Sequence, residues 1–289
     1  MNVHWTFPCL LGIAALSVVD VASAQAPSKS NEEFAKYAMK LREAAISSVE
    51  PRVNMPTARN AGGAYGWRTN IITTTFWVGE NSSVNNPVHN RSSSWDANWA
   101  GSFGGYDNPD PATRTKDFRP KAFIPNQNPF YVALPYNDTT RGTTKAEAKL
   151  VIPWFKREFQ KEGQSVCRDR WVAVRNPRNG RTAYAQWGDC GPFRTDHFEY
   201  VFGSERPKPN LNGGAGLDVS PAVRDFLGIS STDVTDWRFV EVRDVTAGPW
   251  QTYGDNNQFV QRARNSAQPV ASNTVTKPSG EPNVVTRTR

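Results

Sequence analysis

Residues 171–193 read WVAVRNPRNGRTAYAQWGDCGPF, and this stretch decides the fold class. Two runs rich in β-branched, aromatic and alanine residues, 171–175 and 181–187, stand on either side of a turn. The pair Asn179-Gly180 supplies the positive φ angles that a tight hairpin turn requires. The stretch therefore predicts a β-hairpin whose second strand leads into the motif GDCGPF at 188–193.

A second motif, GLDVSPAVRDFLGI at 216–229, follows downstream. It predicts a short helix from Pro221 to Leu227, with Ser220 as N-cap and Gly228 closing the last turn. Together the two motifs resemble the RlpA family, in which a hairpin leads into Asn-Asp-Arg-Gly-Pro-Phe and a later Ile-Asp-Leu-Ser segment opens a short helix. The resemblance covers roughly residues 129–250. It implies a mainly β protein, a double-psi β-barrel with long inserted loops.

Two residues depart from the pattern of this family. The stretch NPFYVALPYND at 128–138 is similar to the family's short strand ending in Leu-Pro, but Tyr131 stands where lytic members have a histidine. Cys190 replaces the motif arginine. Expansins and related endoglucanases of glycoside hydrolase family 45 are a looser likeness, carried by Thr75-Phe76-Trp77 and by Asp218.

The rest of the chain adds further strands and two long inserts. Runs at 71–78, 130–134 and 239–245 have the β-branched and aromatic composition of strands. The segments 79–128 and 193–216 are rich in Gly, Pro, Asn and Asp, and loops of this length in a compact domain are usually functional or disordered. Because the first insert carries several aromatic residues, we expect it to be an ordered lid or groove wall.

The N-terminus has the pattern of an export signal. Residues 9–19 read CLLGIAALSVV, too short to span a bilayer, and the small-residue run Ala22-Ser23-Ala24 follows. We therefore expect a signal peptide at 1–24, a secreted or periplasmic protein, and no integral membrane span in the mature form. In such an oxidising compartment the two remaining cysteines, Cys167 and Cys190, are expected to form a disulfide.

Three further segments complete the domain organisation. Apolar residues recur at helical spacing from Phe34 to Val49 after a capping box at Ser30 and Glu33, which predicts an N-terminal amphipathic helix. This helix and a linker make up 25–70, the barrel domain 71–254, and a polar tail that is expected to be disordered 255–289.

The positive net charge suggests an anionic partner, which outside the cytoplasm would be a polyanion of the wall or surface. The net charge of +7 favours polyanions such as acidic polysaccharide, and no recognisable nucleic-acid-binding module is present. The two cysteines and the scattered His89 and His197 lack the spacing of zinc ligands, so neither a metal nor a cofactor is expected.

The resemblance points to cleavage of a glycosidic bond, which needs a carboxylic acid to protonate the leaving oxygen. Asp189 matches the family's catalytic Asp, although it could equally hold the following turn. Asp218 precedes a helix start that would favour its ionised form, as a base or as a structural carboxylate. Glu80 and Asp138 follow strands and are weaker candidates.

The aromatic residues supply candidate contacts to sugar rings. Trp95 and Trp99 lie in the first insert, and Tyr131 occupies the histidine position; we expect these three to bind substrate. The leading hypothesis is an exported enzyme, a glycoside hydrolase or lytic transglycosylase, acting on peptidoglycan or another cell-wall polysaccharide through Asp189 and Asp218. The alternative is a non-catalytic wall-binding or wall-loosening module, which the missing histidine favours.

Overall fold

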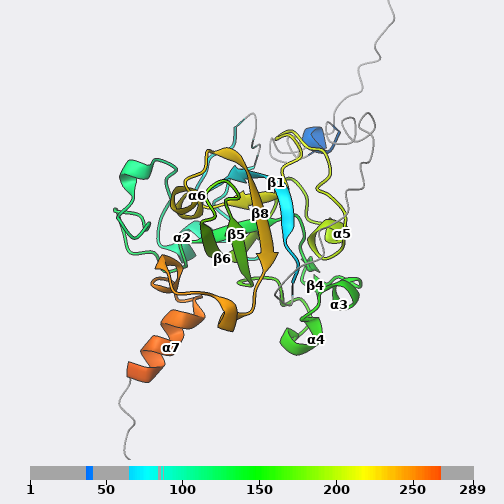
Figure 1. Cartoon of the computed structure of the whole chain (residues 1–289). Coiled ribbons are helices and arrows are strands. Elements are labelled where there is room, and N and C mark those ends of the chain that lie inside the picture. The colour runs from blue at the N-terminus through cyan, green and yellow to red at the C-terminus, as the bar shows by residue number, and fades with distance from the viewer. Residues whose placement is uncertain (1–36, 42–64, 84–85, 87, 268–289) are drawn as a thin grey trace, which may run out of the picture.

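The computed structural model describes residues 37–41, 65–83, 86 and 88–267, and its centre is a closed barrel of six strands (Figure 1). The strands follow one another around the barrel in the order β1-β7-β2-β6-β5-β8. The pairs β1/β7 and β2/β6 are parallel and the others antiparallel. The predicted mainly β class is confirmed. The barrel strands are β1 (Arg68–Thr75), β2 (Tyr131–Leu134), β5 (Trp171–Arg175), β6 (Thr182–Cys190), β7 (Leu217–Val219) and β8 (Thr232–Phe239).

Short helices and a small hairpin surround the barrel. Ser220 Oγ accepts a hydrogen bond from the backbone N–H of Val223 at the start of α6, and Gly228 ends that helix with φ +66°. None of the described helices has the length and apolar character needed to cross a membrane. The remaining elements are β3 (Thr139–Thr140), β4 (Thr143–Thr144), α2 (Trp99–Phe103), α3 (Ala148–Val151), α4 (Phe155–Glu158), α5 (Phe198–Val201), α6 (Pro221–Leu227), α7 (Gln258–Ala267), and the 3-10 turns η1 (Pro111–Thr113), η2 (Val242–Asp244) and η3 (Pro249–Gln251).

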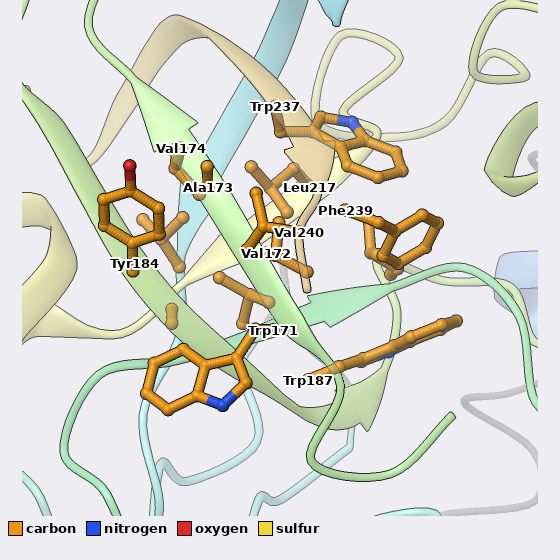
Figure 2. Close-up of a cluster of buried hydrophobic side chains, with 14 of the residues drawn as sticks. Trp171, Val172, Ala173, Val174, Tyr184, Trp187, Leu217, Trp237, Phe239 and Val240 are labelled. Atoms are coloured by element: carbon orange, nitrogen blue, oxygen red, sulfur yellow. The ribbon is translucent and has the colours of Figure 1, made fainter. Parts of the chain in front are cut away.

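The barrel interior is filled by aromatic and branched side chains (Figure 2). Trp187 of β6 and Trp237 of β8 are fully buried, and Phe239 lies against both, with ring centroids 5.8 and 5.2 Å away. The predicted hairpin is present, since β5 and β6 pair from Trp171↔Gln186 to Arg175↔Thr182. Burial on this scale stabilises a domain by about 25 cal/mol per Å² of apolar surface, so the hairpin's inward face anchors the fold.

The two outer strand predictions need correction. The first strand, expected at 71–78, is β1 at Arg68–Thr75. The strand expected at 239–245 is wrong, because β8 ends at Phe239 and the chain then turns into η2. Val240 and Val245 are buried, but as single residues in a loop packed on the core. The alternation of Val240 and Val242 with Glu241 and Arg243 in the sequence imitates the period of a strand.

The chain ends were predicted only in part. Residues 37–41 are helical, while the rest of the predicted N-terminal helix, the signal peptide and most of the linker lie outside the described residues. The tail prediction is wrong between 255 and 267, because α7 is helical and the side chains before it are anchored in the barrel. Asn257 is fully buried and donates hydrogen bonds to the carbonyls of Trp250 and Tyr253. Residues 268–289 are not described.

We expect a chain ending after Gly254 to melt at least about 6 °C below the full chain. The deletion removes the acceptors of Asn128 N–H, Gln186 Nε2 and Trp171 Nε1, each at 2.7–2.9 Å. An unsatisfied buried donor costs about 1–3 kcal/mol, and each kcal/mol lowers Tm by about 2–4 °C at this size. Thermal melts test this. A chain ending after Ala267 keeps these acceptors and is the control; equal melting of both truncated chains would contradict the anchoring role.

Candidate functional site

Asp189 and Asp218 are brought to the same face of the barrel. Asp189 lies on β6 and Asp218 on β7, and both strands flank β2, where Ala133 is the register partner of each. Residues paired across neighbouring strands point to the same face, so the two carboxyl groups stand on either side of the small Ala133 side chain. A strand spacing of about 4.8 Å puts their Cα atoms roughly 10 Å apart.

A β-bulge turns Asp189 towards the outside of the barrel. Trp187 pairs with Val132 and both point into the core, so a regular strand would also send Asp189 inwards. The register shifts between Val132 and Ala133, which leaves Gly188 as the extra residue and pairs Asp189 with Ala133. Bulges of this kind commonly re-aim a side chain beside a functional site.

Asp189 also anchors its surroundings. Its Oδ1 accepts hydrogen bonds from the backbone N–H groups of Ser94 and Cys190, both at 2.7 Å. Burial raises the pKa of Asp189 to about 6, while these N–H groups partly offset the rise. Through Cys190 N–H, Asp189 holds the start of the following turn, as the structural alternative expected, and through Ser94 N–H it also holds the first insert. Its pKa at the same time lies in a range useful for proton transfer.

The two carboxylate oxygens of Asp218 differ in their hydrogen bonding. Thr74 Oγ1 donates a hydrogen bond to Oδ1. Within the described part of the chain no hydrogen-bond partner is found for Oδ2, which faces Gly191 at a point where a Cβ atom would lie 3.6 Å away. A glycine at 191 therefore keeps the space beside this oxygen open.

The pKa of Asp218 is raised to about 7, mainly by burial, with a further contribution from the charge of Asp189. The expectation that a helix start would favour the ionised form is therefore wrong. Asp218 belongs to strand β7 and points to Thr74 of β1, and the N–H groups of α6 are served by Ser220 instead. With this raised pKa, Asp218 suits a proton donor better than a base.

Glu80 is the third carboxyl group of the cluster. Burial raises its pKa to about 7, and the nearby charge of Asp218 adds to the rise. Asn90 Nδ2 donates to its Oε2 at 2.8 Å. Glu80 was a weak candidate from the sequence because it only follows a strand. The available signal was topological: β1 pairs in parallel with β7, so the chain leaving β1 passes the Asp218 position.

Asp138, the other weak candidate, has a structural role instead. It is fully buried, and its two oxygens accept hydrogen bonds from Ser165 Oγ at 2.6 Å and from the backbone N–H of Val166 at 2.7 Å. Such bonds fix the loop that precedes β5. The carboxyl cluster therefore consists of Glu80, Asp189 and Asp218.

Two of the three predicted substrate contacts, Trp99 and Tyr131, lie buried in the structure. Trp99 is buried, donates to Gln127 Oε1 at 3.0 Å and packs on Tyr131. Tyr131 is buried as well; its hydroxyl donates to Asp107 Oδ2 at 2.9 Å and accepts from Val78 N–H. Both therefore hold the first insert on the barrel in a second hydrophobic cluster.

Trp95 remains accessible. It is half-buried, packs edgewise on Trp187 and donates from Nε1 to Asn137 Oδ1 at 2.9 Å. It lines a large open groove together with Ser94, whose backbone N–H donates to Asp189 Oδ1. The insert is thus an ordered groove wall over its described residues, in agreement with the sequence-based expectation.

We expect Tyr131→Phe to lower the free energy of unfolding by about 1–3 kcal/mol, because Val78 N–H and Asp107 lose their partner in a buried site. If Tyr131 only supports the insert, the KM for any glycan substrate stays at the parent value. Chemical denaturation and steady-state kinetics measure the two quantities. Unchanged stability together with a raised KM would restore the substrate-contact hypothesis.

Cys167 and Cys190 are free thiols in this structure, so the disulfide expected from the sequence is not formed in it. Cys167 lies in the loop before β5 and Cys190 ends β6, and the negative charge of Asp138 acts on both thiols. Burial raises the pKa of both thiols well above the ordinary value. Both are therefore protonated at neutral pH.

One group of potential metal ligands occurs among the described residues, although the sequence spacing suggested none. The ligand atoms of His197, Glu199 and Glu205 lie within 4.8 Å of one another. His197 Nε2 lies 3.3 Å from Glu205 Oε2, and burial lowers the pKa of this histidine. The hydrogen bond already uses the ring nitrogen that would face an ion.

The fold and the cluster define a closed β-barrel with a carboxyl site on its outer face. Neither the protein-family models nor the curated proteins contain a match to this chain. The chemistry of the site must therefore be argued from its own residues.

The carboxyl cluster predicts how stability depends on pH. Groups whose pKa is raised on folding bind protons more tightly in the folded state, so the free energy of unfolding should fall as pH rises from about 4 to about 7. Chemical denaturation at pH 5 and pH 8 measures the change. We expect the neutral triple variant Glu80→Gln, Asp189→Asn, Asp218→Asn to be less sensitive over this interval; a parent-like slope would show that the cluster is not the cause.

Proposed function

We propose that this protein is an exported enzyme that cleaves cell-wall polysaccharide by general acid/base catalysis. The observation that carries the proposal is the carboxyl cluster: three acids with pKa values of about 6 to 7, one of which, Asp189, accepts a hydrogen bond from the groove residue Ser94. Acids tuned to this range are what protonation of a glycosidic oxygen near neutral pH requires.

The pKa values suggest the roles of the individual groups. Asp218 donates its proton to the leaving glycosidic oxygen as the bond to the anomeric carbon breaks. Asp189 has the lowest pKa of the three and ionises first, so its carboxylate takes the proton from the attacking water or, in a lytic reaction, from the sugar hydroxyl. The charge of Asp189 helps to keep Asp218 protonated, and the charge of Asp218 in turn raises the pKa of Glu80. The sequence suggested the opposite roles, with Asp189 as the main acid and Asp218 as the base.

The barrel supports the resemblance on which the substrate class rests. Six strands close with two parallel pairs, and the motifs containing Asp189 and Asp218 lie on strands that flank β2. We propose a double-psi arrangement of RlpA type on this basis. Export, inferred from residues 1–24, would place the protein in the wall compartment, where a disulfide between Cys167 and Cys190 remains a proposal that intact mass before and after reduction would test.

A non-catalytic wall-binding module is the second candidate. It is favoured by Tyr131 in the histidine position and by the turn-holding bonds of Asp189 to Ser94 and Cys190. Incubation of the protein with purified sacculi and with soluble wall polysaccharides, followed by mass analysis of released fragments, separates the two. Released fragments support the enzyme, and binding without release supports the module.

A further inference from the structure

A groove of about 1110 Å³ opens beside Asp189, since its lining residue Ser94 donates a backbone hydrogen bond to that carboxylate. Three segments line it, 92–97 of the first insert, 139–142 and 161–165, together with Asn137 and Arg168. Pockets for drug-sized ligands span roughly 300–1,000 Å³, so this groove has room for several sugar rings. We propose that it binds an uncharged stretch of a linear polysaccharide, which extends the proposed function and rests on it.

The charges of the groove are balanced. The basic residues in its lining are Arg141, Lys161 and Arg168, and the acidic ones are Asp96, Glu162 and Asp169. Arg168 is already paired with Asp96 at 3.2 Å and with Asp169 at 3.7 Å. The net charge of +7 is therefore not concentrated here, and a polyanion gains no general attraction from this surface.

Hydroxyl and amide groups make up much of the remaining lining. They can donate and accept hydrogen bonds in the mixed pattern that sugar hydroxyls require. Trp95 adds an aromatic side chain, fixed by its bond to Asn137 and by its contact with Trp187. The uncharged polar residues of the lining include Ser92, Ser93, Thr139, Thr140 and Gln164.

The groove reaches to within one residue of the cluster. Ser94 lines it, and the backbone N–H of the same residue donates to Asp189 Oδ1 at 2.7 Å. A sugar chain held in the groove would therefore lie beside Asp189, one of the proposed reacting groups. A small glycoside would leave most of the groove empty, so the geometry points to cleavage within a polymer.

Calorimetric titration tests the proposal with the N-acetylglucosamine hexamer, the corresponding dimer and polygalacturonate as probes. The Asp218→Asn protein serves as the parent, since it should bind without cleaving. Thr140→Ala with Gln164→Ala removes two exposed groove side chains. Thr246→Ala with Gln261→Ala, exposed residues outside the groove lining, is the matched control.

We expect the hexamer to bind the parent at least about tenfold more tightly than the dimer, and the groove variant to bind the hexamer at least about tenfold more weakly, with no change in the control. Hexamer binding that is unaffected by the groove variant, or binding of polygalacturonate alone, would overturn the inference. Cleavage of sacculi with unaffected hexamer binding removes the groove assignment and leaves the proposed function. Groove-dependent hexamer binding without cleavage of any polymer keeps the groove assignment and removes the proposed enzymatic function.

Discussion

Replacing Asp218 with Asn is expected to lower the rate of glycan cleavage at least about a hundredfold, the typical loss on removing a general acid. The amide oxygen still accepts the hydrogen bond from Thr74, while Oδ2, which faces the open space at Gly191, becomes an NH₂ group that cannot release its proton. Because binding contacts are unchanged, the loss should appear in kcat and kcat/KM alike. Rates of fragment release from sacculi measure it.

Asp244→Asn is the matched control, since Asp244 is exposed in η2. Folding is monitored by thermal melts. The Asp218→Asn protein should be at least as stable as the parent at pH 8, because it no longer carries a half-buried charge beside Glu80 and Asp189. A folded Asp218→Asn protein that cleaves at the parent rate would remove Asp218 from the acid role.

The sequence predicted the parts of the fold that depend on local pattern. The hairpin of β5 and β6 was readable because Asn179-Gly180 separates two strand-forming runs. Ser220, Pro221 and Gly228 mark the ends of α6 by hydrogen bonding and backbone preference, which are properties of neighbours in the chain. The ends of β5 and β6 and the caps of α6 lie within a few residues of the sequence signals that mark them. Sequence alone could therefore place them.

The site depended on contacts between distant segments and was predicted only in part. Asp189 and Asp218 were found through their motifs, but Glu80 enters the cluster through the parallel pairing of β1 and β7, which no local pattern shows. Trp99 and Tyr131 looked like sugar contacts because their residue types suit both roles. Only the structure shows that the insert folds back and buries them.

The pKa of Asp218 also depends on contacts that a local sequence pattern does not show. A local argument places it near a helix start, where ionisation is favoured, but burial and a neighbouring carboxylate act in the opposite direction and dominate. The position of the first insert, which begins next to Glu80, is likewise set by distant contacts, through Asp107, Arg114 and Tyr131 in a buried network. That network lies more than fifty residues from either motif, so sequence spacing contains no trace of it.

Replacing Asp189 is expected to separate its two roles. Asp189→Asn keeps Oδ1 as the acceptor for Ser94 and Cys190 N–H, so the insert stays in place, yet the amide cannot accept a proton from water. We expect cleavage to fall at least about a hundredfold with little loss of stability. Asp189→Ala removes the acceptor as well and should in addition lower the free energy of unfolding by about 1–3 kcal/mol. Denaturation curves and fragment release, measured on both variants, give the two effects.

The contrast between these variants decides between base and scaffold. If Asp189 is only a scaffold, Asp189→Asn keeps the parent rate and Asp189→Ala loses activity in proportion to its unfolded fraction. If it is the base, the two variants are equally inactive although their stabilities differ, because the missing proton acceptor is common to both. The pH profile gives a second criterion: the parent rate should decline below about pH 6, where Asp189 becomes protonated, and the residual rate of Asp189→Asn should lack that acidic limb. An acidic limb retained in the Asp189→Asn protein would assign the proton acceptor to another group, and Glu80 is the neighbour that could supply it.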